Sequence, residues 1–412
     1  MHICIVSETY PPEINGVAKT LYRIAQDLKQ LGHRVSIIRP HQQGEARVSS
    51  RADESIVPSL PIPLYQGLHF GLPCRNRLRA IWKDQPPDII YVATEGPLGL
   101  SAINVALKTG IAVTSGFHTN FHKYMRHYRL PGMAKLTERF LRKTHNKTLR
   151  TFAPTQDVIN QLNKMGVANT RLLGRGVDCE LFNPKKRNIA LRQSWGLQSD
   201  EDAAAIFVSR IAAEKNIPLA IEAFKQIKRT RPDISCIFVG DGPEKLRLQK
   251  QYPQFKFVGM QTGEQLSNYY ASGDLFIFPS LTETFGNVIA EAMASALVPV
   301  AFDYAAARSL ITDSENGFLA QYDNADAFLK KTAEAIQHST EWPSIRLQAR
   351  KKAEELNWLS IVEKFATELY IAFIEHNSNE PHPLTSAPKH SNKNSVLAGF
   401  NWFKTREFLL EN

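Results

Sequence analysis

Short apolar segments recur along the chain, and most are followed by polar residues and then by a longer segment with helical spacing. Each is four to six residues long and is bounded by polar residues, Pro or Gly, which is typical of strands buried on both faces of a parallel sheet. The segments that we assign as strands are His2–Val6, Arg34–Ile38, Ile89–Val92, Ala112–Ser115, Ala204–Ser209, Cys236–Val239, Phe255–Val258, Leu275–Phe278 and Val298–Phe302. This alternation predicts an α/β fold in which helices cover parallel sheets.

The first and last helices are the clearest of the helical segments. A helix from about Val17 to Leu31 follows the first strand, and Gly32 is its stop signal. A second helix from Trp358 to His376 carries Ile361 and Phe365 on its apolar face. The polar, Pro-bearing residues that follow predict a flexible tail.

The length of 412 residues exceeds that of one ordinary domain, so we expect two doubly wound domains of roughly 180 residues each. The segment LLGRGVDCELFN, residues 172–183, is the expected connection between them. The expected division is residues 1–182, residues 183–358, a helix over 359–376 that crosses back to the first domain, and a flexible tail over 377–412.

The composition is that of a soluble globular protein, with 43% hydrophobic and 22% charged residues. No apolar run approaches the roughly 18 residues that span a bilayer, and the N-terminus lacks the basic region of a signal peptide. We therefore expect a cytoplasmic protein. The four cysteines lack metal-site or disulfide spacing, so we expect reduced thiols and no bound metal.

The charge is distributed unevenly. Residues 1–190 hold 27 Lys and Arg against 13 Asp and Glu, whereas residues 191–412 hold 23 against 27. The whole basic excess therefore lies in the N-terminal half, which suggests an anionic partner, either a nucleic acid or a membrane surface.

The most basic window, residues 121–150, has nine cations against the single acid Glu138. Tyr, Leu, Met and Phe residues lie between the cations, and parts of the window fit an amphipathic helix. A solvated helix face is one interpretation, and an interfacial helix on anionic lipid is the other. The residues that we assign to the membrane or acceptor surface are Lys123, Arg126, Arg129, Arg139 and Arg142.

The stretch FIFPSLTETFGNVIAEAMASALVPVAF, residues 276–302, predicts a strand, a polar turn, a helix and a second strand. Glu283 lies in the turn, and Glu291 follows eight residues later, two turns into the helix. The N-terminus of such a helix binds anions, and carboxylates beside it suit the hydroxyls of a sugar. Alone, the two residues could equally be a turn residue and a solvated helix position; together they suggest a nucleotide-sugar site.

Three further candidates lie where predicted strands end, which is where open α/β sheets bind ligands. His118 follows the strand at Ala112–Ser115, and Arg210 and Lys215 lie in the loop after Ala204–Ser209. Gly16, before the first helix, would let a ligand approach the backbone closely. As isolated residues, these signals are weak.

In combination and in this order, Gly16, His118, Arg210 with Lys215, and Glu283 with Glu291 resemble the motifs of the retaining glycosyltransferases of family four, also called group 1 glycosyl transferases. The resemblance covers roughly residues 1–375 and is closest to a subgroup that contains glycolipid-forming glucosyl- and mannosyltransferases. It implies a GT-B fold, in which two Rossmann-like doubly wound domains face a central cleft.

The resemblance also implies roles for individual residues. Arg210, Lys215 and the helix N-terminus would hold the donor diphosphate, Glu291 the ribose, and Glu283 the hydroxyls of the donor sugar, which His118 would position. The catalytic residues expected in this way are His118, Arg210, Lys215 and Glu283, and the donor-binding residues are Gly16, Gly259, Met260, Phe285, Gly286, Asn287, Val288 and Glu291. Because fixed cations would meet the charge of the leaving group, no metal or other cofactor is expected.

The implied reaction moves a hexose from UDP-glucose, UDP-glucuronate or GDP-mannose to an acceptor at the inner membrane face, preferably a diacylglycerol-type lipid. A polysaccharide or lipopolysaccharide precursor is the alternative acceptor. A nucleic-acid-modifying glycosyltransferase and a nucleotide-sugar epimerase are further alternatives. Apolar residues at helical spacing in the basic window argue against nucleic acid, and an epimerase would need no acceptor surface.

Overall fold

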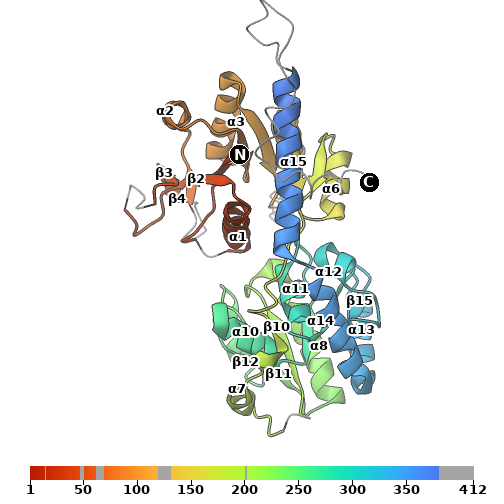
Figure 1. Cartoon of the computed structure of the whole chain (residues 1–412). Coiled ribbons are helices and arrows are strands. Elements are labelled where there is room, and N and C mark those ends of the chain that lie inside the picture. The colour runs from red at the N-terminus through yellow and green to blue at the C-terminus, as the bar shows by residue number, and fades with distance from the viewer. Residues whose placement is uncertain (14, 47–50, 62–68, 119–130, 200–201, 380–412) are drawn as a thin grey trace, which may run out of the picture. The chain divides into compact units, whose positions relative to one another are not determined.

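The computed structural model describes residues 1–13, 15–46, 51–61, 69–118, 131–199 and 202–379. These residues build two parallel sheets, each with helices packed around it (Figure 1). We call the part of the chain from β1 to β9 the first half and the part from β10 to β15 the second half. Both sheets belong to the doubly wound α/β class that the alternation of apolar segments predicts.

The first half contains a seven-stranded sheet in the order β3-β2-β1-β6-β7-β8-β9, in which all neighbouring strands are parallel. Its elements are β1 (His2–Val6), α1 (Gly16–Gln30), β2 (Arg34–Pro40), β3 (Glu54–Val57), β4 (Ser59–Pro61), β5 (His69–Gly71), α2 (Arg75–Asp84), β6 (Ile89–Val92), α3 (Pro97–Thr109), β7 (Ala112–Gly116), α5 (Pro131–His145), β8 (Thr151–Ala153), α6 (Gln156–Lys164) and β9 (Thr170–Leu172). β4 and β5 form a separate antiparallel pair.

Alternate residues of β1 face two different layers of helices, as the two-residue period of a strand requires. Ile3 and Ile5 belong to a core that also contains residues of α1 and of α15 (Trp358–Asn379). Cys4 and Val6 belong to a second core, with residues of α2 and α3. The central strands are therefore buried on both faces, which explains their nearly continuous apolar sequences.

The second half contains a six-stranded parallel sheet in the order β12-β11-β10-β13-β14-β15. Its elements are η1 (Pro184–Lys186), α7 (Ile189–Ser194), β10 (Ala204–Val208), η2 (Ala213–Lys215), α8 (Ile217–Thr230), β11 (Ser235–Val239), α9 (Lys245–Gln251), β12 (Lys256–Phe257), α10 (Gly263–Ser272), β13 (Leu275–Phe278), α11 (Asn287–Ala294), β14 (Val298–Phe302), α12 (Ala305–Leu310), β15 (Phe318–Ala320), α13 (Ala325–Gln337), η3 (Ser339–Glu341) and α14 (Trp342–Glu354). Residues of these strands and helices share one large core.

The long helix α15 packs against the first sheet through Val362, Phe365 and Leu369, as the aromatic contact of Phe365 with Tyr91 at 4.9 Å illustrates. It ends at Asn379, three residues beyond the predicted end, so residues 377–379 are helical rather than part of a flexible tail. Residues 380–412 lie outside the described residues. Within the described part of the chain, no helix combines the length and the apolar character that crossing a bilayer requires.

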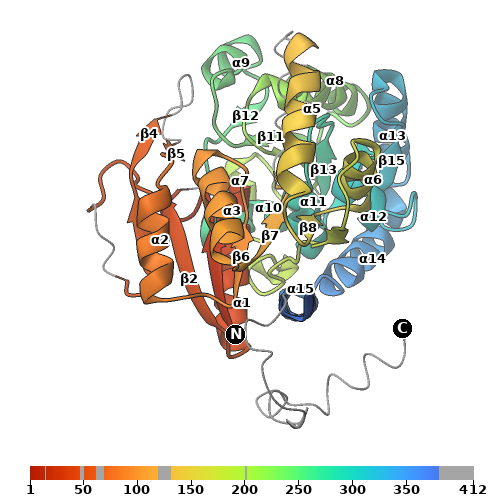
Figure 2. The same cartoon turned by 90° about the horizontal axis from the view of Figure 1, so that it is seen from above.

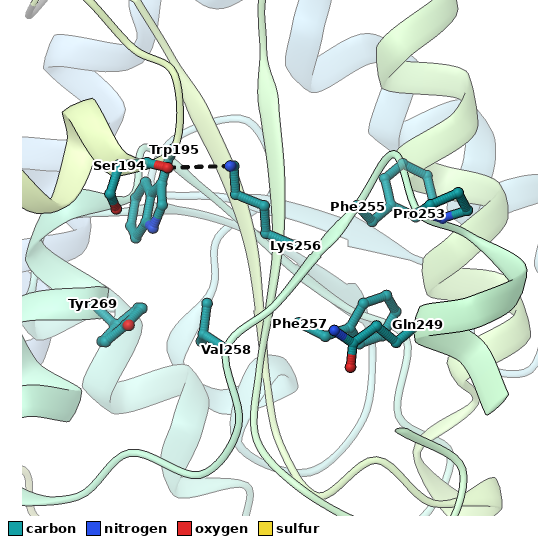
Figure 3. Close-up of a pocket in the computed structure, with 9 residues that line it drawn as sticks. All are labelled: Ser194, Trp195, Gln249, Pro253, Phe255, Lys256, Phe257, Val258 and Tyr269. Carbon is teal, nitrogen blue, oxygen red and sulfur yellow. Dashed lines mark hydrogen bonds between the residues drawn. The ribbon is translucent and has the colours of Figure 1, made fainter. Parts of the chain in front are cut away.

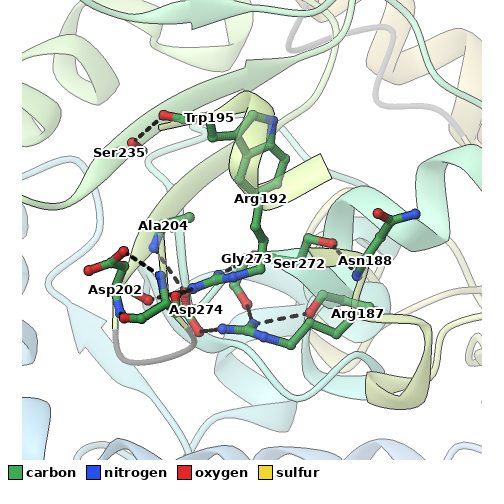
Figure 4. Close-up of polar contacts among 12 residues, drawn as sticks. Arg187, Asn188, Arg192, Trp195, Asp202, Ala204, Ser235, Ser272, Gly273 and Asp274 are labelled. Carbon is green, nitrogen blue, oxygen red and sulfur yellow. Dashed lines mark hydrogen bonds and ion pairs between the residues drawn. The ribbon is translucent and has the colours of Figure 1, made fainter. Parts of the chain in front are cut away.

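Three arginines converge on the buried carboxylate of Asp274, which lies just before β13. Figure 4 shows two of them, Arg187 and Arg192. Arg192 donates to Oδ2 at 3.0 Å, whereas Arg187 at 3.0 Å and Arg346 at 3.2 Å reach Oδ1. The backbone N–H of Ala204 also donates to Oδ2, at 2.9 Å. This cluster ties the connection before β10 and helix α14 to the amino ends of β10 and β13, opposite the edge where the candidate site lies.

Candidate active site

Glu283 lies in the turn between β13 and α11, and its carboxylate is held by groups from two loops. Lys215, at the end of η2, donates to Oε1, and the Ser280 hydroxyl donates to the same oxygen at 2.8 Å. The Tyr304 hydroxyl donates to the backbone carbonyl of Glu283 at 2.8 Å, which fixes the turn itself. The structure therefore brings together Lys215 and Glu283, which the sequence places 68 residues apart.

The N-terminus of α11 directly follows this turn. Gly286 is its N-cap residue with a φ of 97°, a left-handed conformation that favours glycine. No side chain among the described residues caps the helix, so the first-turn N–H groups of Asn287 and Val288 are suited to an anion. Phe285 and Gly286 line a small pocket together with Ser280 and Glu283.

Glu291 lies on α11, about one turn from its start at Asn287 rather than the two turns expected from the sequence, and accepts a hydrogen bond from the Tyr270 hydroxyl at 2.9 Å. Burial raises the pKa of the Glu291 carboxyl, and the bond from Tyr270 acts against that rise. One protein donor holds Glu291 on one side, and the carboxylate can still accept hydrogen bonds from two ligand hydroxyls.

Arg210 follows β10 and pairs with Glu214, its neighbour one helical turn along the loop. About half of the Arg210 side chain is exposed, whereas Lys215 and Glu283 are each only 15% exposed. Arg210 can therefore reorient towards a bound anion more readily than Lys215 can.

Gly259 and Met260 follow the edge strand β12. Gly259 has a φ of 77° and its carbonyl accepts a hydrogen bond from the N–H of Gly240 at 2.8 Å, which joins the ends of β11 and β12. The Met260 side chain is 62% exposed, an unusual position for a large apolar residue and one suited to packing on a planar base.

In the first half, Gly16 is the first residue of α1, and the Asn15 side chain caps the helix by accepting from the N–H of Ala18 at 2.8 Å. The backbone at Gly16 thus lies at a helix N-terminus beyond the carboxyl end of β1, as expected for the glycine loop.

His118 follows β7 and is only 4% exposed, and both of its ring nitrogens have protein partners. Nε2 lies 2.6 Å from the Tyr91 hydroxyl, and the guanidinium of Arg175 donates to Nδ1. Burial, helped by the charge of Arg175, holds the pKa of His118 well below its usual value, so the ring is neutral. The role of His118 in positioning the donor sugar stays a prediction.

Two buried carboxyl groups, Glu8 and Glu95, follow the neighbouring strands β1 and β6. Glu8 accepts hydrogen bonds from the backbone N–H groups of Gly71 at 2.5 Å and Leu98 at 2.8 Å, and burial raises its pKa to about 7. Glu95 is 8% exposed, and its Oε1 has no hydrogen-bond partner among the described residues. Burial raises the pKa of Glu95 to about 8, and the nearby charge of Glu8 adds to the rise.

The basic window divides into three parts in the structure. Lys123, Arg126 and Arg129 lie outside the described residues. Arg139 and Arg142 are exposed on α5, a long helix of the first half (Figure 2). Arg150, which closes the window, is buried beside Glu368 of α15 at 3.5 Å and therefore is not part of a basic surface.

A pocket larger than the one beside Glu283 lies elsewhere in the second half. It has a volume of about 420 Å³ and lies beside β12, α7 and α10, where Trp195 and Tyr269 face each other with ring centroids 5.8 Å apart (Figure 3). Lys256 crosses it and donates to the Ser194 carbonyl at 3.1 Å. None of the expected donor-binding residues lines this pocket, so size does not identify the candidate site here.

Four residues of this region are not among the candidates predicted from the sequence, namely Tyr91, Arg175, Glu8 and Glu95. A tyrosine within the aliphatic segment IIYV is itself a signal, because a buried hydroxyl requires a partner. Glu8 and Glu95 directly follow predicted strands, the position that identified His118. Arg175 lies between two glycines in a segment read only as an interdomain connection, and no pattern marks it as buried.

Each half of the chain matches the model of a known protein family. Residues 190–355 match the model of Glycosyl transferases group 1, and residues 14–181 match that of Glycosyltransferase Family 4. A GDP-mannose-dependent alpha-mannosyltransferase of Corynebacterium glutamicum is 30% identical over 361 residues, which cover 87% of this chain and 86% of the relative. An alpha-monoglucosyldiacylglycerol synthase of Streptococcus pneumoniae is 28% identical, covering 80% of this chain and 78% of the relative.

The solved structures show the same fold. Anabaena HepE in complex with UDP superimposes with a TM-score of 0.71 at 19% identity, covering 90% of this chain and all of that one. This chain, with its two parallel sheets covered by helices, therefore has the GT-B fold. Fold, family models and relatives agree with the expectation from Gly16, His118, Arg210, Lys215, Glu283 and Glu291. The chain belongs to glycosyltransferase family 4, the group 1 glycosyl transferases.

Proposed function

We propose that this protein transfers a hexose from a nucleotide diphosphate sugar to a diacylglycerol-type lipid at the cytoplasmic face of a membrane, with retention of the anomeric configuration. The observation that carries the proposal is the position of the Lys215–Glu283 pair directly before the N-terminus of α11. The carboxylate suits the hydroxyls of the donor sugar, and the backbone N–H groups suit the diphosphate. The cation suits the negative charge that develops on the diphosphate as it leaves.

The proposed roles follow from the chemistry of each group. Lys215, Arg210 and the N–H groups of Asn287 and Val288 hold the diphosphate and stabilise the charge that develops as the glycosidic bond breaks. Because these charges are fixed in the protein, we propose that no metal is required. His118 positions the donor sugar.

The two carboxylates bind hydroxyl groups. Glu283 accepts hydrogen bonds from the sugar, and Glu291 accepts them from the ribose. Because Lys215 and Ser280 both donate to Glu283, its charge is compensated, which favours hydrogen bonding over nucleophilic attack. A Glu283 that binds hydroxyls in this way fits a reaction that keeps the anomeric configuration without forming a covalent glycosyl-enzyme.

The proposed acceptor surface includes helix α5. Its side chains Leu136 and Phe140 are 67% and 41% exposed, and Lys135, Arg139, Arg142 and Lys143 surround them. Exposed apolar side chains beside cations suit a helix that lies on anionic lipid. The relative named as a monoglucosyldiacylglycerol synthase supports a lipid acceptor, and the relative named for GDP-mannose makes that donor one of those to test first.

Thermal unfolding with candidate donors tests the donor class. A ligand present at 100 times its dissociation constant stabilises the folded state by about 2.7 kcal/mol, which raises Tm measurably. UDP-glucose, UDP-glucuronate and GDP-mannose are compared with the free nucleotides and with free hexoses. We expect one nucleotide sugar to raise Tm above the values measured with the free nucleotides and the free hexoses. If none of the three nucleotide sugars raised Tm, the result would contradict the proposal.

A further inference from the structure

We propose that Arg175 is a positioning residue that acts through His118, by fixing which ring nitrogen carries the proton and how the ring is oriented. The contact between the two side chains is a property of the structure alone. Its consequence for hexose transfer rests on the proposed function, in which His118 positions the donor sugar.

The hydrogen bonds around His118 allow one tautomer. A guanidinium group has only donors, so Nδ1 of His118 must accept the bond from Arg175. In a neutral imidazole the proton is then on Nε2, which donates to the Tyr91 hydroxyl oxygen at 2.6 Å. Arg175 and Tyr91 therefore hold opposite sides of one ring, and a 180° flip of the ring would break both bonds.

The environment of Arg175 holds its guanidinium group in one orientation. The side chain is 5% exposed, and Nη1 donates to the carbonyls of Leu173 at 2.9 Å and Gly174 at 3.1 Å. No carboxylate pairs with Arg175 among the residues that the structure describes. Burial lowers its pKa to about 10, so the group is still charged at neutral pH. A buried cation without a counter-charge is costly, and this one is oriented on its own loop so that Nη2 reaches His118.

The packing around the ring is tight as well. A side chain at Gly116, the last residue of β7, would place its Cβ 2.3 Å from the Tyr91 hydroxyl and 2.8 Å from Nε2 of His118. Both distances are too short for any carbon atom, so the ends of β6 and β7 close around the Tyr91–His118 pair. With glycine there, the ring has one position and one set of partners.

The test combines a spectroscopic and a kinetic measurement. Nitrogen-15 spectra of the His118 ring report directly which nitrogen carries the proton. In the parent protein we expect a single tautomer protonated on Nε2. In Arg175→Met we expect a mixture of tautomers or a ring that becomes protonated at higher pH, because the accepting bond and the nearby charge are both lost.

The kinetic measurement is a double-mutant cycle in hexose transfer. A small misplacement of a positioning group costs about 10²-fold, so Arg175→Met is expected to lower kcat by about that factor with little change in donor KM. In a His118→Ala background the same change should cost nothing further, because an effect that acts through His118 disappears with it. Arg175→Lys should restore part of the loss, since lysine keeps the charge and one donor.

Arg171→Met is the matched control. Arg171 lies four residues earlier on β9, is 40% exposed and pairs with Glu368 instead of His118. It should leave both the His118 spectrum and kcat unchanged. If Arg175→Met does not fold, Arg175→Gln, which also removes the charge next to His118, provides both measurements.

Two results would overturn the proposal: an unchanged His118 spectrum in the folded Arg175 variant, or kinetic losses that multiply in the double mutant. If the parent transfers no hexose from any donor, the proposed function fails, and the spectrum alone decides whether Arg175 sets the tautomer of His118.

Discussion

Lys215 and Ser280 donate to the same carboxylate oxygen of Glu283, so Lys215 and Glu283 share one ion pair at the edge of the second sheet. The sequence motifs suggest separate roles for the two residues, one on the diphosphate and the other on the sugar. The structure shows that each also fixes the position of the other. Because both side chains are only 15% exposed, the pair is preorganised rather than a mobile surface contact.

Replacing either cation of this edge should slow the chemical step. We expect Arg210→Ala and Lys215→Ala each to reduce kcat by about 10²–10³-fold, the usual effect of removing one preorganised donor. The control is Lys225→Ala, which removes an exposed cation of α8 that pairs with Glu222. This change should leave kcat unaltered. Transfer rates are measured with a chelator present. Undiminished activity in the double variant would exclude the electrostatic role.

Replacing Glu291 should weaken donor binding more than it slows transfer. Loss of a charge-assisted hydrogen bond costs about 1.5–3 kcal/mol, which corresponds to roughly a 10- to 150-fold rise in the donor dissociation constant. Tyr270→Phe, which removes the protein donor to Glu291, should have a smaller effect of the same kind. Glu222→Ala on α8 is the control. A Glu291→Ala variant with unchanged donor affinity and a collapsed kcat would contradict the ribose assignment.

Glu95 should make the fold less stable as pH rises. Its pKa rises from about 4.5 in the unfolded chain to about 8 in the folded protein, so between these values the folded state binds the extra proton. Stability is therefore greatest below pH 4.5 for this group and is lost as pH rises to about 8, with a slope of up to about 1.4 kcal/mol per pH unit.

Urea unfolding of the parent and of Glu95→Gln at pH 5.5, 7.0 and 8.5 measures this contribution. Glutamine cannot ionise, so the variant should gain stability relative to the parent at each step up in pH. The charge of Glu8 acts on Glu95, and the charges of Glu95 and Arg175 both act on Tyr91. These other groups are the same in the parent and in the variant. A constant difference between the two proteins at all three pH values would refute the assignment.

Asp274 should be essential for stability. Asp274→Ala would leave Arg187, Arg192 and Arg346 without their shared carboxylate, and breaking a buried ion pair in this way costs about 3–5 kcal/mol. Asp233→Ala removes an exposed carboxylate paired with Arg231 and should cost no more than about 1 kcal/mol. Denaturant unfolding compares the two. Equal losses would mean that the three arginines find other partners.

The basic face of α5 should dock the protein on anionic lipid. Each Arg near such a surface contributes about 1 kcal/mol, so replacing Arg139 and Arg142 by Ser should weaken vesicle binding by roughly 30-fold and leave donor binding intact. Replacing Arg126 and Arg129 as well, which lie outside the described residues, should weaken it further. Serine at Arg247 and Lys250 of α9 is the control. Co-sedimentation that depends on neither anionic lipid nor salt would exclude this surface.

The sequence predicts the fold well because its central strands are buried on both faces. Nine segments were assigned as strands, and all nine are strands in the structure, although Phe255–Val258 shortens to Lys256–Phe257. The missed strands are three residues long, as β8 and β15 are, or four residues long, as β3 is, which is too short for a clear periodicity. The helix expected within residues 276–302 ends at Ala294, since Ala296 has a φ of 57°.

The candidate site was predictable only in part. Strand ends and the family motifs identify Glu283, Glu291, Arg210, Lys215 and His118, because those residues are close in sequence to the elements that position them. The contacts that define their state come from distant segments. Arg175 is 57 residues from His118 and Lys215 is 68 residues from Glu283, and no local pattern encodes either pairing.

Analysis of the product is the most direct test of the central claim. The full chain is incubated with each labelled nucleotide sugar and with anionic vesicles that contain diacylglycerol, and the lipid product is examined by proton NMR. We expect one donor to give a hexosyl lipid in which the anomeric configuration of the donor is kept, with one nucleoside diphosphate released per hexose. A product of inverted configuration, or no labelled lipid with any of the donors, would contradict the account.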